Sequence, residues 1–234
     1  MEKSPATARR SASTPAQGRG SSRAEGSPRA EGSSRAEGSP RADGRGEKRR
    51  RRIYKSLHDC IINKGYVKTT LADIAEGAGM TASHLLYYFN GKEAILERYF
   101  ANVSVRFLEK IESFSQHPPQ QQVELLADFW FRGETSTRLE IGFMLECFGA
   151  AVNDDVLRIT KADFDSRCKA HLVDIFLAAP ALVLNNASDS AEIAYSMMIG
   201  LRSAVYFDED ISLERAHALF TNAVNRMCGF EARP

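Results

Sequence analysis

Apolar side chains recur every three or four residues along most of the chain after residue 50. This period is that of an amphipathic α-helix, and no stretch shows the strict apolar and polar alternation of a strand. A first helix carries Ile53, Leu57 and Ile61 on one face and ends at Gly65, and two short helices follow. Six further helices are predicted near residues 92–116, 120–132, 137–152, 154–178, 190–207 and 212–229. The pattern therefore predicts an all-α fold of about nine helices, with Ser188 and Ser212 as caps of the last two.

The segment from Thr69 to Lys92 predicts two short helices joined by a tight turn. Thr70 and Asp73 have the spacing of a capping box at the start of the first helix. Gly79 stands where a helix end favours a left-handed residue, and Thr81 can cap the second helix. The two helices are therefore expected to meet at a sharp angle.

The second short helix, from Thr81 to Phe89, sorts its side chains onto two faces when successive residues are placed about 100° apart. The apolar face is Ala82, Leu85, Leu86 and Phe89. The other face carries hydroxyl, imidazole and phenol groups, on Thr81, Ser83, His84, Tyr87 and Tyr88. Such groups can bond base edges and phosphates, and no carboxylate among them would repel DNA. The alternative is an ordinary helical hairpin with a polar outer face.

Lys92 follows the Asn90-Gly91 turn, where its charge and the free backbone N–H groups of a helix start could bind a phosphate. The DNA contacts predicted from this region are Thr70, Thr81, Ala82, Ser83, His84, Tyr87, Tyr88 and Lys92. At ~1.5 Å per residue, the helix from Lys92 to Gln116 would be about 37 Å long. It could therefore join a DNA-binding head to the rest of the protein.

Residues from about Arg50 to Phe100 resemble the DNA-binding domain of the tetracycline-repressor (TetR) family. The resemblance rests on Thr70, Asp73-Ile74-Ala75, Ala78-Gly79, Thr81, Leu85, Tyr88-Phe89 and Lys92-Glu93, in register. It implies a dimeric, all-helical transcription regulator whose helix from Thr81 to Phe89 reads an operator, with a C-terminal domain that binds a small molecule. The stretch from Ile199 to Ala216 resembles the BetI-like branch of the family, which implies that the last two helices pair with their symmetry mates in a dimer.

Two positions depart from the family pattern. The family usually has an aromatic residue at the position of Leu86, which the two-face pattern places inward here, so Tyr87 is expected to supply a phosphate contact instead. The family often has glycine at the position of Ser83, where a hydroxyl contact is expected in place of close approach.

Residues 1–46 differ in composition from the rest of the chain. Four hexapeptides of the form Ser-Ser/Pro-Arg-Ala-Glu/Asp-Gly run from Ser21 to Gly44 and contain no apolar residue larger than alanine. Such a segment cannot bury enough surface to offset its conformational entropy, so residues 1–46 are expected to be a disordered arm. The basic run that follows is predicted to lie along phosphates or enter the minor groove, through Arg49, Arg50, Arg51 and Arg52. A solvated charge run without a binding role is the alternative.

The net charge of +1 conceals an uneven distribution, because residues 1–52 hold 14 Lys or Arg against 6 Asp or Glu. Attraction to polyanions is therefore concentrated near the N-terminus. No apolar run reaches the length of a membrane span, and the N-terminus lacks the apolar segment of a secretory signal. A cytoplasmic, nucleoid-associated protein without a membrane partner is expected.

Residues that carry catalysis or bind metals are not grouped in this sequence. The four cysteines stand singly, the five histidines are scattered, and neither a Ser/His/Asp or Cys/His set nor a phosphate-binding loop occurs. The sequence therefore predicts no enzyme, no metal and no cofactor, and the cysteines are expected to be small buried hydrophobes with no redox role assigned.

Aromatic and sulfur-containing residues gather in the predicted C-terminal helices. Core packing explains any one of them. Together they suit an adaptable apolar cavity with a few polar contacts. The effector pocket predicted on this basis is Trp130, Phe143, Met144, Cys147, Phe148, Phe164, His171, Tyr195 and Met198.

The chain as a whole is predicted to comprise a disordered arm (1–46), a helix-turn-helix DNA-binding domain (47–92) and a helical effector-binding and dimerisation domain (93–234). The expected function is a homodimeric repressor that a small apolar or amphipathic effector releases from a palindromic operator. The alternative is a non-specific or architectural DNA binder that relies on the basic arm. Operator preference in the absence of the arm would distinguish the two.

Overall fold

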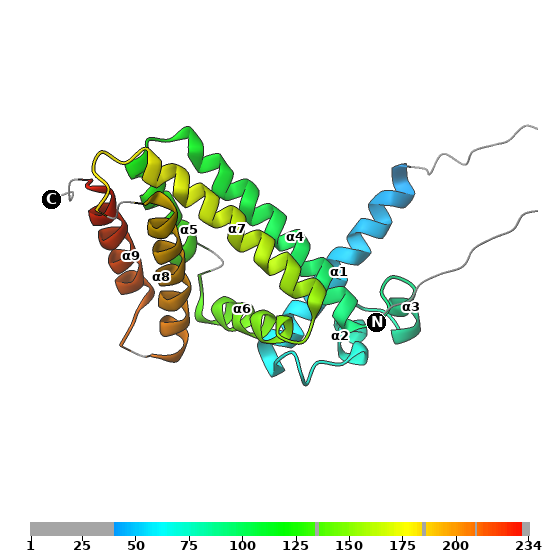
Figure 1. Ribbon diagram of the computed structural model, residues 1–234. Coiled ribbons are helices and arrows are strands. Elements are labelled where there is room, and N and C mark those ends of the chain that lie inside the picture. Colours follow the sequence, from blue (N-terminus) through cyan, green and yellow to red (C-terminus); the bar gives the residue numbers. More distant parts are fainter. Residues whose placement is uncertain (1–39, 134–135, 184–185, 209, 231–234) are drawn as a thin grey trace, which may run out of the picture. The chain divides into compact units, whose positions relative to one another are not determined.

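The computed structural model describes residues 40–133, 136–183, 186–208 and 210–230, and all regular structure in these ranges is helical (Figure 1). The elements are α1 (Pro40–Lys64), α2 (Leu71–Gly77), α3 (Ala82–Leu86), α4 (Lys92–Ser113), the 3-10 helix η1 (Phe114–Gln116), α5 (Pro119–Phe131), α6 (Arg138–Ala151), α7 (Asp155–Leu177), α8 (Ala187–Phe207) and α9 (Leu213–Cys228). The all-α fold predicted from the periodicity is confirmed. None of the described helices is long and apolar enough to cross a membrane.

The turn between α2 and α3 forms as its capping residues predict. Thr70 Oγ1 accepts from the Asp73 N–H at 3.2 Å, and the Asp73 carboxylate accepts from the Thr70 N–H at 2.7 Å. Gly79 adopts a left-handed φ of +68°. Thr81 caps α3 by accepting from the His84 N–H at 3.2 Å. A cap of this kind typically contributes about 1 kcal/mol, so local sequence contributes to the stability of the hairpin.

Helix α3 is shorter than the predicted span from Thr81 to Phe89. It has five residues and ends at Leu86. The 100° step of a helix therefore does not predict where the side chains after Leu86 point. Leu85 is fully buried, but Leu86 is 48% exposed. Ala82 is exposed as well. The predicted inward placement of Leu86 and Ala82 is therefore wrong.

Two other helix starts differ from prediction. Helix α1 begins at Pro40, inside the segment expected to be disordered, because proline suits the first helical turn, where its missing N–H leaves no bond unmade. Residues 1–39 of the predicted arm lie outside the described residues. Helix α8 is capped by Asn186, which accepts from the Ser188 N–H at 2.8 Å, so Ser188 lies within the helix and is not its cap.

Buried apolar side chains form two clusters within the described residues. The first packs α1, α2 and α3 against the beginning of α4, and we call these helices the N-terminal domain. The second packs the end of α4 with α5, α7, α8 and α9. Helix α6 contributes to both clusters, with Phe143 and Cys147 in the first and Ile141 in the second. It therefore links the N-terminal domain to the remaining helices.

Candidate DNA-binding face and ligand cavity

Helix α3 presents a polar surface. Its N-cap and all of its residues except Leu85 are exposed, and Tyr87 after it is 82% exposed. The ring of Tyr88 lies 5.5 Å from the ring of His84 and 5.3 Å from that of Tyr87. The predicted contacts lie on α3 or directly beside it, and we call this set the α3 face: Thr81, Ala82, Ser83, His84, Tyr87 and Tyr88. Thr70 is exposed too, with its hydroxyl donating to Asp73 at 2.5 Å.

One residue of the basic run reaches this face. Arg49 on α1 donates from Nη1 to the Tyr88 hydroxyl at 3.0 Å. Because Arg49 to Arg52 lie on a helix and not in an extended arm, successive side chains diverge by about 100°. Arg51 instead pairs with Glu47 on the same helix at 3.2 Å. Arg49 is therefore hydrogen-bonded beside α3, and DNA contacts by the four arginines stay a prediction.

The Lys92 side chain binds carbonyl oxygens of its own domain. Its Nζ donates to the carbonyl oxygens of Tyr66 and Thr69, each at 3.0 Å, and to that of Val67 at 3.5 Å. It also lies 4.5 Å from the centre of the Tyr66 ring. An ammonium group has three N–H donors, and all three are directed at the loop between α1 and α2. A phosphate contact at Lys92 stays a prediction, and the backbone N–H groups at the start of α4 remain available as donors for it.

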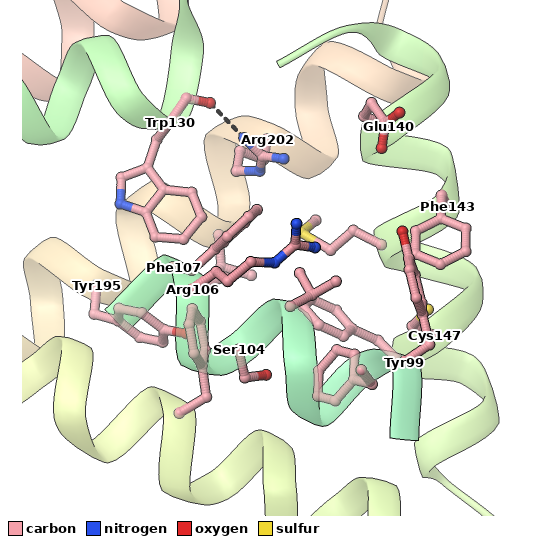
Figure 2. A pocket seen from close by; sticks show the side chains of 16 residues that line it. Tyr99, Ser104, Arg106, Phe107, Trp130, Glu140, Phe143, Cys147, Tyr195 and Arg202 are labelled. Carbon is pink, nitrogen blue, oxygen red and sulfur yellow. Dashed lines mark hydrogen bonds between the residues drawn. The ribbon is translucent and has the colours of Figure 1, made fainter. Parts of the chain in front are cut away.

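A cavity of about 140 Å³ lies between α4, α5, α6, α7 and α8 (Figure 2). Most of its walls are aromatic or aliphatic. Seven of the predicted pocket residues line it: Trp130, Phe143, Met144, Cys147, Phe148, Phe164 and Tyr195. The sequence pattern thus identifies much of the cavity wall, although whether an effector binds there stays a prediction.

Two predicted pocket residues lie elsewhere. Met198 lines a separate void of about 10 Å³, which Trp130 and Tyr195 also line. His171 is buried but lines neither space, and its Nε2 has no hydrogen-bond partner among the described residues. Burial lowers the pKa of His171, against weaker opposing effects of Asp174 and Glu112. His171 is therefore a buried neutral side chain outside the cavity.

Charged side chains that the sequence reasoning missed also line the cavity. They are Arg106 on α4, Glu140 on α6 and Arg202 on α8. Arg202 is 3% exposed, donates to the Trp130 carbonyl oxygen and lies over the Trp130 ring. Burial lowers the pKa of Arg202 to about 10, and the nearby Glu140 carboxylate acts in the opposite direction. A lone arginine within the apolar stretch of α8 is the signal that could have revealed it.

The wall formed by α7 and α8 is closed by a polar pair. The Tyr195 hydroxyl donates to Asp165 Oδ1, and the Lys161 ammonium pairs with Asp165 Oδ2, both at 2.5 Å. Burial, followed by the Asp165 hydrogen bond and charge, raises the pKa of Tyr195. The Tyr195 phenol is thus a neutral group of the cavity wall whose O–H is already hydrogen-bonded to Asp165.

Helix α6 joins the cavity to the N-terminal domain by direct contacts. Phe143 and Cys147 line the cavity and also pack in the hydrophobic cluster of that domain. His58 Nε2 on α1 lies 3.0 Å from Glu140 Oε2, and the His58 ring is 4.5 Å from the Phe143 ring. A displacement of α6 would therefore be transmitted to α1.

Comparison with known proteins identifies the N-terminal domain. Residues 53–99 match the family model described as bacterial regulatory proteins of the tetR family. Residues 53–99 therefore form a DNA-binding domain of the tetR family. Members of this family are DNA-binding transcriptional regulators and not enzymes, so the predicted family and helix-turn-helix are confirmed. Among the described residues, no group of three or more His, Cys, Asp or Glu could hold a metal ion.

Solved structures share the fold of this chain over most of its length, at low sequence identity. A transcriptional regulator from Rhodococcus sp. Rha1 is 13% identical with a TM-score of 0.69, covering 79% of this chain and 99% of that one. A TetR transcription regulator from Haloarcula marismortui is 18% identical with a TM-score of 0.68, covering 77% and 98%. The fatty acid degradation regulator FadR from Bacillus halodurans is 16% identical with a TM-score of 0.64, covering 77% and 95%. No curated protein matches the sequence.

Proposed function

We propose that this TetR-family regulator is a homodimeric repressor that binds a palindromic operator through the α3 face and is released by a small effector in the cavity. The observation that carries the proposal is the double role of α6. Phe143 and Cys147 belong at once to the cavity wall and to the core of the N-terminal domain. A ligand that favours a different position of α6 would therefore lower DNA affinity by its differential binding energy.

An unpartnered face on α8 and α9 supports the homodimer. Ile193 is 49% exposed and Leu219 is 43% exposed. A side chain added at Gly200 would meet nothing within 4 Å, so this part of α8 is open to close approach by another helix. A two-fold axis through this face would present two α3 helices to successive major grooves, about 34 Å apart. The operator should then be palindromic.

Selection of bound duplexes from a random DNA pool at physiological salt tests this function. The protein should lack residues 1–39 and not 1–46, because α1 begins at Pro40. Recovery of a palindrome supports the specific repressor. Recovery of unrelated sequences, with affinity falling steeply as salt rises, favours the non-specific alternative that relies on the basic residues.

His84→Ala refines the test. His84 lies on the exposed α3 face, so its loss should change the preferred bases, whereas the exposed His117 is the matched control and its replacement should leave the selected sequence unchanged. An unchanged selection with His84→Ala would argue that another element reads the operator.

A further inference from the structure

The charge arrangement in the cavity points to the chemical class of its ligand. Arg106 is exposed at the cavity edge, and no described residue pairs with or hydrogen-bonds its guanidinium. In Figure 2 the Arg106 side chain extends among the lining residues, with the guanidinium directed toward the side of Tyr99 and Phe143. An unpaired guanidinium beside an apolar cavity offers two parallel N–H donors to a planar anion.

Three other polar groups of the cavity, on Glu140, Arg202 and Tyr195, already have partners. Glu140, the one carboxylate among the described lining residues, has Oε2 3.0 Å from His58 Nε2. Arg202 donates to the carbonyl oxygen of Trp130. The Tyr195 hydroxyl donates to Asp165. Arg106 is therefore the charged group left for a ligand.

Tyr99 can supply a second donor to the same anion. It lines the cavity on α4, two turns before Arg106. Burial raises the pKa of Tyr99 to about 12, with Glu140 acting in the same direction and Arg106 against it. The phenol therefore keeps its proton at neutral pH and is available to donate. The remaining wall, including Phe107, Trp130 and Phe164, is apolar and aromatic.

We infer that the cavity binds a compact amphipathic carboxylate, with Arg106 and the Tyr99 hydroxyl on the carboxylate and an aromatic or short aliphatic body against Phe107, Trp130 and Phe164. This inference rests on the proposed function in taking the cavity as the effector site. It adds the sign of the ligand charge and the residue that reads it. Size agrees as well, because a cavity of about 150 Å³ is enough to hold a benzene ring.

The test uses three probes with the same phenyl body: phenylacetate, 2-phenylethylamine and 2-phenylethanol. Calorimetric titration of the full chain should show phenylacetate binding about tenfold or more tightly than either of the others, since a charge-assisted pair typically accounts for such a factor. Arg106→Gln should remove this preference. Arg98→Gln is the matched control, because Arg98 is an exposed arginine on the same helix outside the cavity.

Each other outcome overturns the inference. Tighter binding of 2-phenylethylamine would mean that Glu140 sets the ligand charge. Equal binding of all three probes would mean that the cavity reads only the apolar body, and no binding of phenylacetate at millimolar concentration would exclude carboxylates of this size. Duplex selection by the same protein separates the two proposals. If a palindrome is recovered but phenylacetate does not bind, the proposed repressor function holds and the inferred ligand class fails. If phenylacetate binds in an Arg106-dependent way but no palindrome is recovered, the ligand class holds and the repressor function fails.

Discussion

At the residue scale, the Lys92 side chain makes partly buried contacts within its own domain, where a contact with DNA was predicted. Its ammonium is surrounded by carbonyl oxygens from the loop that joins α1 to α2, and the Tyr66 ring lies beside it. A hydrogen bond from a charged donor contributes about 1.5–3 kcal/mol to stability, more than a neutral one. The side chain therefore contributes to the stability of the helix-turn-helix whether or not DNA is present.

Lys92→Met should accordingly destabilise the protein by about 1–3 kcal/mol, since it keeps the apolar stem against Tyr66 but leaves carbonyl oxygens without a donor. Urea unfolding followed by circular dichroism measures this change. Lys68→Met is the control, because Lys68 is exposed on the same loop. If Lys92→Met kept full stability and lost only operator affinity, the side chain would be a phosphate ligand after all.

His171 makes stability depend on pH. Burial lowers its pKa below the ordinary value of 6.5, so near and below that value the unfolded chain takes up a proton that the folded chain does not. The stabilising contribution is complete above the unfolded pKa and is lost as the pH falls below it. Unfolding free energies measured from about pH 7 to pH 5 should therefore decline, and His171→Gln should flatten this slope. His117→Gln, at an exposed position, should leave it as steep as in the parent protein.

At the scale of the element, α6 is the helix through which the cavity and the DNA-binding domain can affect each other. It places Glu140 at the cavity and beside His58 of α1, and Glu146 further along accepts from the Tyr66 N–H at 3.1 Å. Coupling between two sites needs an element whose position both of them bias, and α6 satisfies this requirement by its contacts.

Glu140→Gln should therefore lower operator affinity several-fold although it lies away from the α3 face, because α1 is held less firmly against α6. His58→Gln should do the same, and the double variant should lose no more than either single one, with a coupling energy of about 0.5–3 kcal/mol. Operator titration of the four proteins measures this cycle. Tyr195→Phe serves as control, since its bond to Asp165 joins α8 to α7 only. Additive losses would show that the pair carries no coupling.

At the scale of the whole molecule, the proposed dimer depends on the α8 and α9 face. Leu219→Glu places a charge where two apolar helix surfaces would meet, and a buried unpaired charge costs several kcal/mol. Sedimentation at micromolar concentration should show a shift from dimer to monomer, together with loss of operator binding. Ile159→Glu is the control, because it places the same charge at an exposed apolar residue on α7. This variant should remain dimeric. A Leu219→Glu protein that stayed dimeric would place the interface elsewhere.

Interactions between residues close in sequence are sufficient to predict much of the secondary structure of this protein. The periodicity predicts the helices from α4 to α9, and the Thr70 and Asp73 capping box, the left-handed Gly79 and the Thr81 cap predict the turn between α2 and α3. These features depend on residues within a few positions of one another, so the sequence by itself determines them. The same local string also carries the family resemblance.

Other features of the DNA-binding domain and of the cavity depend on contacts between residues distant in sequence. The Arg49 bond to Tyr88 and the carbonyl oxygens around Lys92 follow from how α1 and the α1–α2 loop pack on neighbouring elements. The cavity charges come from three separate helices, on which Arg106, Glu140 and Arg202 have no common sequence pattern. Helical spacing predicts which face of a helix is apolar but not which helix it meets. Only the tertiary structure therefore decides that α6 serves the cavity and the DNA-binding domain together.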